Sequence, residues 1–174
     1  MDRETEKLIN SLNPSSLNVL EISGTRWDQP NLFRKYKSVT YPDFDICERC
    51  LDETYDLIIA EQVFEHLLWP YRAGRNVFAM LRPGGHFLIT TPFLIRIHKS
   101  PADCTRWTET GMKHFLAECG FALDEIQVSS WGNRACVKAN FGPWQIYQSW
   151  RHSLRNESDF PVVVWAMARK SVTC

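Results

Sequence analysis

The chain has 174 residues, with 20 Lys and Arg balanced by 20 Asp and Glu, and 44% of its residues are hydrophobic. This length suits one core, so we expect residues 1–174 to form a single domain. The balanced charge disfavours a protein that holds nucleic acid by bulk electrostatics. No run approaches the roughly 20 apolar residues that cross a bilayer, and residues 1–10 lack the apolar segment of a secretory signal. We therefore expect a cytoplasmic protein with no membrane contact.

Hydrophobic periodicity predicts strands and helices that alternate along the chain. In chain order, the predicted elements are a helix at 4–12, a strand at 18–22, a short helix at 31–36, a strand at 37–41, a buried strand at 55–60, a short helix at 61–67, a helix at 74–81, a buried strand at 86–91, a helix at 112–119, and strands at 122–129 and 162–169. Such alternation indicates an α/β fold, with a mostly parallel sheet and helices on both faces. The last two strands are expected to be antiparallel neighbours at one edge.

The connection between the first strand and Asp45 is short. A parallel crossover needs about a dozen residues, and the segment from Ile22 to Asp45 barely supplies one. We therefore expect the sheet to be abbreviated there.

The fold itself nominates a site, because ligands of such sheets bind beyond the carboxyl ends of the strands. The first strand ends at Glu21-Ile22 and runs into Ser23-Gly24-Thr25, whose small residues let backbone N–H groups approach a ligand. Asp43 and Asp45 lie 22 and 24 positions after Glu21. Nucleotide-binding proteins place an acid for ribose hydroxyls about 20 residues on. The same residues equally fit a plain turn and two loop caps, and spacing alone does not separate these interpretations.

Three segments and their order favour the nucleotide-binding interpretation over a plain turn. They are VLEI at 19–22, YDLIIAEQVFEH at 55–66 and MLRPGGHFLI at 80–89. They resemble, in that order, the first-strand, fourth-strand and fifth-strand motifs of class I S-adenosylmethionine-dependent methyltransferases. The stretch 92–121 is similar to the type-11 methyltransferase branch, whose members often act on carbohydrates or secondary metabolites. Together the resemblance covers about residues 16–121.

The resemblance implies a Rossmann-like fold, S-adenosylmethionine as cofactor, and methyl transfer to an O or N atom of a small molecule such as a sugar or secondary metabolite. Glu21 would stand under the methionine end of the cofactor, and the backbone at 23–25 would cradle it. Asp43 or Asp45 would bind ribose hydroxyls or the adenine amine, while Glu61 and Gln62 would line the pocket near the sulfur. The implied cofactor-binding residues are Glu21, Ser23, Gly24, Thr25, Asp43, Asp45, Glu61 and Gln62.

The loop after the first strand departs from the usual G-x-G-x-G pattern of these enzymes. Ser23, Thr25 and Trp27 stand at the aligned positions, and Gly24 is the only glycine left. This departure favours an alternative, a degenerate and non-catalytic methyltransferase-like module that binds a metabolite or scaffolds a partner. A nicotinamide-dependent oxidoreductase is a second rival, but the missing G-x-G-x-x-G and the position of Glu21 count against it.

Residues after the fifth-strand motif are the candidates for catalysis. His98 would take a proton from the acceptor, Asp103 would orient that histidine, and Arg106 would hold a carboxylate or phosphate. The alternative is a structural loop, with an Asp–Arg ion pair, a core tryptophan and a surface histidine. The expected substrate-binding residues are Phe93, Trp107, Trp131, Asn133 and Arg134.

No metal site is expected from the sequence. Cys47 and Cys50 form a C-x-x-C pair without the second pair that a zinc site needs, so they are interpreted as plain thiols. Glu65 and His66 are expected to cap and pack a helix. The substrate pocket should be walled by 92–107 and 131–150, and completion by a second copy in a homodimer remains open.

Overall fold

The computed structural model describes residues 2–99, 101–143, 147–150 and 152–172. Its centre is one six-stranded sheet in the order β2-β1-β3-β4-β6-β5. The strands are β1 (Asn18–Ile22), β2 (Lys35–Val39), β3 (Tyr55–Glu61), β4 (Leu81–Pro92), β5 (Ile126–Trp131) and β6 (Val163–Arg169). The first four strands pair in parallel, whereas β6 runs antiparallel to both β4 and β5. The predicted mostly parallel sheet with an antiparallel C-terminal strand is confirmed.

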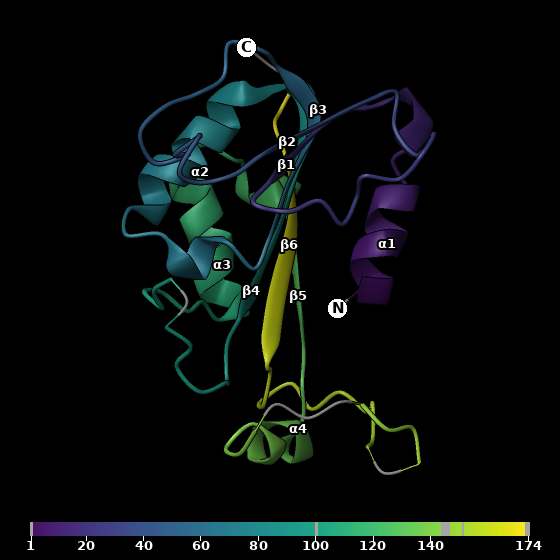
Figure 1. The fold of residues 1–174 in the computed structure, drawn as a ribbon, viewed down its shortest axis with the longest axis vertical. Coiled ribbons are helices and arrows are strands. Elements are labelled where there is room, and N and C mark those ends of the chain that lie inside the picture. Colours follow the sequence, from purple (N-terminus) through teal and green to yellow (C-terminus); the bar gives the residue numbers. More distant parts are fainter. Residues whose placement is uncertain (1, 100, 144–146, 151, 173–174) are drawn as a thin grey trace.

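Helices cover both faces of the sheet, as predicted (Figure 1). One face carries α1 (Asp2–Asn10), and the other carries α2 (Pro70–Met80) and α3 (Glu109–Glu118). The short α4 (Arg134–Ala139) lies beyond the end of β5. Three 3₁₀ turns complete the described elements: η1 (Pro14–Ser16), η2 (Phe64–His66) and η3 (Leu123–Glu125).

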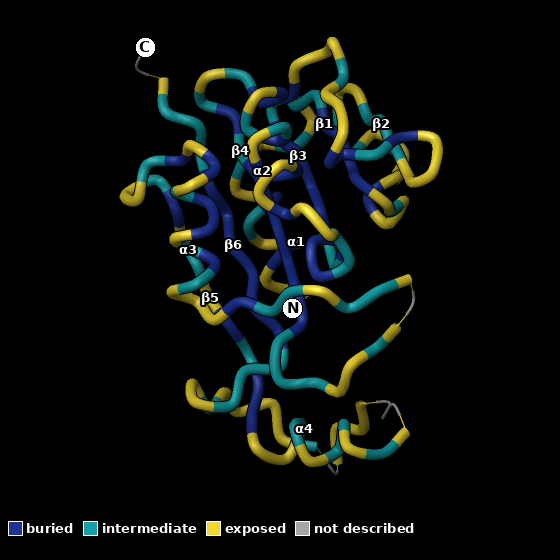
Figure 2. The backbone as a smooth tube through the Cα atoms, turned by 90° about the vertical axis from the view of Figure 1, so that its left-hand side faces the viewer, coloured by how far each residue is buried: buried dark blue, intermediate teal, exposed yellow. Residues whose placement is uncertain are grey.

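Two apolar clusters fix these layers in place, and the strands between them form the buried interior seen in Figure 2. The larger cluster joins the sheet to α2 and α3 and includes Ile58, Phe87 and Phe115, all nearly inaccessible. The smaller one joins the opposite face to α1 through residues that include Ile9 and Trp27. Side chains alternate between the two clusters along each buried strand, as the period of two in a pleated strand requires.

The crossover between β1 and β2 is abbreviated, as the sequence predicted. Residues 23–34 contain turns and no helix, so the short helix expected at 31–36 is wrong. Asn31 has a left-handed backbone with φ of 61°, which interrupts any helix, and β2 already begins at Lys35. Trp27 from this segment is only 3% exposed and packs in the cluster beneath α1. One buried indole thus covers sheet surface that a crossover helix would otherwise cover.

Several other boundaries differ from the sequence prediction: α2 begins at Pro70 rather than at 74, β2 spans Lys35–Val39 rather than 37–41, and β4 begins at Leu81 rather than at 86. The helix expected at 61–67 is only the single 3₁₀ turn η2, and the strand expected at 122–129 begins at Ile126, after η3. No helix among the described residues is long and apolar enough to cross a membrane.

Candidate functional site

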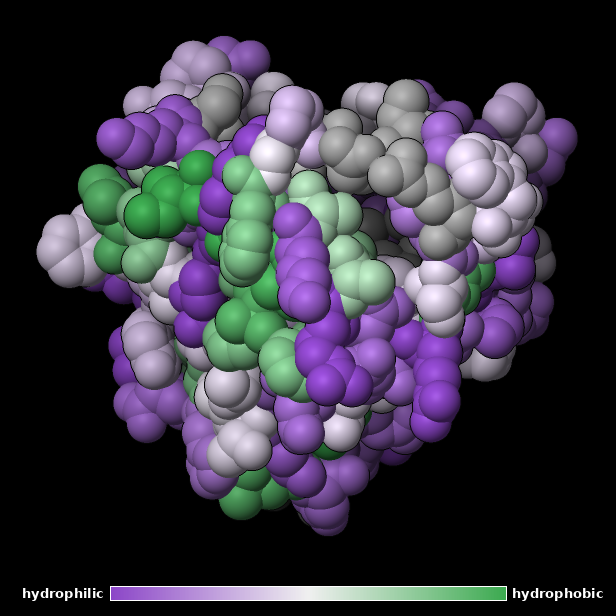
Figure 3. Space-filling model, turned by 90° about the horizontal axis from the view of Figure 1, so that it is seen from below, coloured by the Kyte–Doolittle hydropathy of each residue, from purple (hydrophilic) through white to green (hydrophobic). Residues whose placement is uncertain are grey.

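The neighbouring parallel strands β1 and β3 are each followed directly by a residue with a left-handed backbone. Ser23 has φ of 58° and Gln62 has φ of 57°. The Ser23 N–H donates to the Val39 carbonyl at 2.7 Å, and the Gln62 N–H donates to the Thr90 carbonyl at 2.9 Å. The chain therefore turns sharply at both strand ends, on the end of the molecule seen in Figure 3.

A buried carboxylate organises the turn after β1. Glu21 is 3% exposed and accepts the backbone N–H groups of Arg26 at 3.1 Å and Trp27 at 3.0 Å. It also accepts the Tyr36 hydroxyl at 2.6 Å. A Cβ atom on Gly24 would lie 2.3 Å from Glu21 Oε1, so the turn can pass this close to the carboxylate only with glycine at position 24.

The same turn leaves donors for a ligand. Within the described part of the chain, the N–H groups of Gly24 and Thr25 have no acceptor, and Thr25 is exposed. Beyond the end of β2, the exposed Asp43 carboxylate likewise has no hydrogen-bond or ion-pair partner among those residues. Asp45 instead accepts the Cys47 N–H at 2.8 Å and caps its own loop. Backbone donors suit a ligand carboxylate and a free aspartate suits a ribose diol, so these residues fit S-adenosylmethionine.

The end of β3 completes this group of predicted residues. Glu61 binds Arg26 at 3.1 Å and the Trp27 indole N–H at 3.0 Å, which ties β3 to the turn after β1. The Gln62 side chain donates to Thr90 Oγ1 on β4 at 3.0 Å. The structure thus brings Glu61 and Gln62 together with the turn at 23–25, and both side chains have partners within the protein.

The three predicted catalytic residues lie together in the segment between β4 and α3, but their contacts differ from those expected. Asp103 accepts the backbone N–H of His98 at 3.0 Å rather than its ring N–H. Arg106 donates to Asp103 at 2.9 Å and to the Phe93 carbonyl at 2.9 Å. This pairing with Arg106 holds the pKa of Asp103 below its usual range, and burial lowers the pKa of His98. Asp103 and Arg106 therefore brace the segment that carries His98.

The predicted substrate-binding residues divide into three places. Phe93 follows β4 and is partly buried against the larger core cluster. Trp107 is 6% exposed and packs on Phe115, with ring centroids 5.0 Å apart, so it belongs to the core. Trp131 and Asn133 lie at the end of β5, outside the segment that carries His98.

Residues at and just after the end of β5 contact the segment that leads from α4 back to β6. Trp131 donates its indole N–H to the Leu154 carbonyl at 3.0 Å. Asn133 is buried and caps α4 by accepting the Cys136 N–H at 2.8 Å. Arg134 pairs with Glu157 at 2.7 Å. These contacts hold the segment after β5 in place.

A polar cluster that the sequence reasoning missed lies beside this site. Glu65 is fully buried, and both oxygens of its carboxyl lack a hydrogen-bond partner in the described structure. Burial raises its pKa above the ordinary range. The rings of His66 and His98 meet edge to face, with centroids 5.0 Å apart. Glu65 and His66 close the 55–66 motif that begins with β3, and His98 follows β4. Because neighbouring parallel strands bring such segments together, the expected pairing of β3 with β4 was the signal that could have revealed this cluster.

The cysteines behave as plain thiols. All those described are free. Cys47 and Cys50 each contact a backbone carbonyl, of Trp69 and Asn76 respectively. Burial raises the pKa of both thiols, which disfavours the reactive thiolate.

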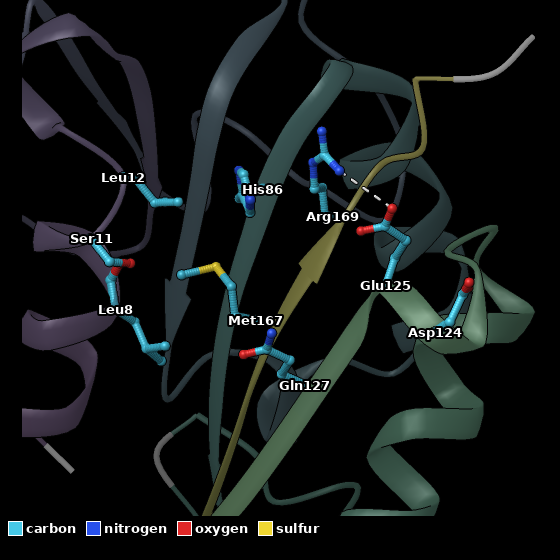
Figure 4. Close-up of a pocket in the computed structure, with 9 residues that line it drawn as sticks. All are labelled: Leu8, Ser11, Leu12, His86, Asp124, Glu125, Gln127, Met167 and Arg169. Carbon is cyan, nitrogen blue, oxygen red and sulfur yellow. Dashed lines mark hydrogen bonds and ion pairs between the residues drawn. The ribbon is translucent and has the colours of Figure 1, made fainter.

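A separate cavity of about 160 Å³ lies on the face of the sheet that carries α1 (Figure 4). Leu8 and Leu12 face it from the α1 side, and His86, Met167 and Arg169 face it from the strands. It lies near the start of β4, away from the carboxyl ends of the parallel strands. Its volume is below the roughly 300 Å³ of ordinary ligand pockets, so we do not assign it to the cofactor.

Comparison with known proteins gives the family. A family model described as a methyltransferase domain matches residues 1–126. A S-adenosylmethionine-dependent methyltransferase from Mesorhizobium loti is 17% identical, with a TM-score of 0.56 over 94% of this chain and 96% of that one. A protein described as a possible histamine N-methyltransferase from Thermotoga maritima is 12% identical, with a TM-score of 0.61 over 97% and 96%. No curated protein matches the sequence.

A third solved structure contains a ligand. The N-methyltransferase NodS from Bradyrhizobium japonicum, in complex with S-adenosyl-L-homocysteine, is 16% identical, with a TM-score of 0.57 over 97% of this chain and 86% of that one. At such low identity these likenesses show the fold, while the family model spans well over half of the 174 residues. The chain therefore belongs to the methyltransferase-domain family and is a class I S-adenosylmethionine-dependent methyltransferase.

Proposed function

We propose that the protein transfers a methyl group from S-adenosylmethionine to an oxygen or nitrogen atom of a small molecule. The observation that carries the proposal is the set of unpaired groups at adjacent strand ends. These are the N–H groups of Gly24 and Thr25 and the carboxylate of Asp43, which have no partner within the described residues. They have the chemistry to hold the carboxylate and the ribose of the cofactor.

The residues of the chain then have separate roles. The backbone at 24–25 binds the amino-acid end of the cofactor, Asp43 binds its ribose, and Glu21 keeps the turn in shape. When bound, S-adenosylmethionine supplies a methyl group already activated by a sulfonium. The remaining requirement is to hold the acceptor in line with that methyl group, and such positioning can supply much of the rate. Phe93 and the braced segment that carries His98 lie on the acceptor side.

The surface around the site supports an acceptor with an apolar part. Leu68, after η2, is 73% exposed and Ile97, after β4, is 70% exposed. Hydrophobic side chains gather on this end of the molecule, towards the side of α2 and α3 (Figure 3). This composition favours a secondary metabolite over a simple sugar. Two of the similar structures are named as N-methyltransferases, one of them as a possible one, which supports a nitrogen acceptor.

The turn after β1 argues against a degenerate module. Serine at position 23 already adopts the left-handed conformation that glycine would supply. Glycine is present at position 24, where a side chain would collide with Glu21. The turn therefore forms with a single glycine, and the missing ones do not remove the cradle.

Calorimetric titration with S-adenosylhomocysteine tests the proposal. The wild type should bind, and Asp43→Ala should bind at least about tenfold more weakly, because the ribose loses charge-assisted hydrogen bonds. Asp124→Ala is the matched control, since that exposed aspartate borders the remote cavity. Absence of wild-type binding at millimolar cofactor would overturn the proposal.

A further inference from the structure

Three potential ligands for a metal ion converge beside the acceptor side of the site. Glu65, His66 and His98 each offer one donor atom, and these atoms all lie within 4.8 Å of one another. The Glu65 side chain is fully buried, and neither of its carboxyl oxygens has a hydrogen-bond partner in the described structure. An unpaired buried carboxylate is costly, so its position calls for a cation or a proton.

The protonation of His66 points to the same conclusion. The backbone carbonyl of Ala102 contacts His66 Nδ1, and a carbonyl can only accept, so Nδ1 must carry the proton. In the neutral ring, the lone pair is then on Nε2, which lies 3.6 Å from Glu65 Oε1. An ionised Glu65 and this nitrogen are both acceptors. A positive ion between them would satisfy both groups at once.

The third donor is fixed by the surrounding loop. Asp103 accepts the backbone N–H of His98 at 3.0 Å and is itself held by Arg106. The N–H groups of Cys104 and Thr105 donate to the Glu65 carbonyl, at 2.7 and 3.3 Å. Metal ligands are commonly oriented by such outer hydrogen bonds, above all at the second nitrogen of a ligating histidine.

We propose that Glu65, His66 and His98 bind one divalent transition-metal ion. Two imidazoles and a carboxylate suit Zn²⁺, and also Mn²⁺ or Fe²⁺, more than Mg²⁺ or Ca²⁺. Metal–ligand bonds of about 2.0–2.2 Å require the donors to close in by less than about 1 Å from their present positions. This site was not expected from the sequence, in which Glu65 and His66 read as packing residues.

Three protein ligands leave a coordination position open, as in catalytic rather than structural metal sites. In a catalytic role, which rests on the proposed function and on its oxygen alternative, the ion would bind a hydroxyl of the acceptor and ease loss of its proton to water. The oxygen would then form a bond to the methyl carbon as the carbon–sulfur bond breaks, giving a methyl ether and S-adenosylhomocysteine. Binding of the metal itself does not depend on that reaction.

The test is titration of chelator-treated protein with ZnCl₂ and MnCl₂ by calorimetry, without cofactor. The wild type should bind one equivalent of at least one of the two ions. Glu65→Gln and His98→Gln should each bind about 100-fold more weakly or worse, because each loses a direct ligand. Glutamine at position 65 keeps the shape and can donate to His66, so this variant should fold. His114→Gln, at an exposed histidine on α3, is the control and should bind as the wild type does.

A second readout separates this site from the thiols. Co²⁺ bound to the wild type should give the visible spectrum of nitrogen and oxygen ligands without a thiolate charge-transfer band. Saturating Zn²⁺ should raise the Tm of the wild type by about 5 °C or more and leave that of Glu65→Gln unchanged. No wild-type binding, equal binding by Glu65→Gln, or a thiolate band would each overturn the proposal. Cofactor titration of the metal-free protein shows separately whether the proposed function fails.

Discussion

The Glu21 carboxylate shows how one residue shapes the cofactor end of the site. It is buried, yet three donors satisfy it: two backbone N–H groups of the turn and the Tyr36 hydroxyl. Buried charges persist only when they are paired in this way. Because the donors come from the turn after β1 and from β2, the carboxylate holds both against the end of its own strand.

Substitution of Gly24 tests how closely the turn must approach this carboxylate. Gly24→Ala would place a Cβ 2.3 Å from Glu21 Oε1, so the carboxylate or the turn must move and its hydrogen bonds weaken. We expect a loss of about 1–3 kcal/mol in the free energy of unfolding, measured in urea, and weaker cofactor binding. Gly142→Ala is the control, because a Cβ there meets nothing within 4 Å. Equal stability of the two variants would contradict the expectation.

Removal of the Tyr36 hydroxyl tests the third donor. Its 2.6 Å bond to Glu21 is charge-assisted, and such bonds contribute about 1.5–3 kcal/mol. Tyr36→Phe should therefore lose stability of that order in urea unfolding at neutral pH. Tyr41→Phe should change stability by less than about 0.5 kcal/mol, since Tyr41 is 72% exposed. A Tyr36 variant as stable as the Tyr41 variant would show that Glu21 does not need this donor.

At the scale of elements, the start of α3 is stabilised by a side-chain cap. The Thr108 side chain precedes the helix and accepts the Gly111 N–H at 3.0 Å, and Met112, Phe115 and Leu116 of this helix pack in the larger core. Thr108→Ala should cost about 1 kcal/mol of unfolding free energy by urea titration. Thr110→Ala, at an exposed position inside the first turn, should cost clearly less, and a reversal of this order would contradict the assignment of the cap.

The elements show which parts of the fold the sequence could predict. Strands with continuous apolar runs, such as 55–60 and 86–91, were found because burial on both faces leaves a distinct pattern. The helix expected at 31–36 is wrong because Asn31 turns left-handed and Leu32 and Phe33 pack beneath α1. Those contacts depend on where α1 docks, about 20 residues away in sequence, and periodicity within one segment does not contain that information.

The site was predictable to a similar degree. The turn at 23–25 and Asp43 follow from the rule that ligands lie beyond strand ends. The contacts of His98, Asp103 and Arg106 do not follow, because the described residues between β4 and α3 form no helix or strand. Their hydrogen bonds instead reach Phe93 after β4 and Glu65 in η2. The sequence supplied the acid and the histidines of the Glu65 cluster, but only pairing of β3 with β4 brings them together.

At the scale of the whole molecule, the two faces of the sheet are covered unequally. Helices α2 and α3 cover one face, while α1 and the segment 23–34 cover part of the other (Figure 1). The cavity shown in Figure 4 lies between α1 and the strands on that second face. His86 borders it near Arg169, and Arg169 pairs with Glu125 at 3.4 Å. The cavity beside α1 therefore leaves a titratable side chain, His86, partly buried near the smaller cluster.

This placement predicts an acid-sensitive contribution to global stability. Burial first, and the charge of Arg169 second, lower the pKa of His86 in the folded protein, while Glu125 opposes them. The unfolded chain, with an ordinary histidine pKa of about 6.5, therefore takes up the proton first as the pH falls. Stability from the neutral ring is full above about pH 6.5 and is lost as the pH falls through the folded pKa.

The stability of the wild type relative to His86→Gln isolates this contribution, because the other titrating groups are common to both proteins and largely cancel. Urea unfolding at about pH 7.5 and about pH 5 should show that the wild type loses more stability on acidification than the variant does. If the wild type instead gains stability relative to the variant in acid, the effect of Glu125 on the pKa of His86 outweighs those of burial and Arg169. An unchanged difference would mean that the ring is as hydrated in the folded protein as in the unfolded chain, and that the smaller cluster does not reach β4 at His86.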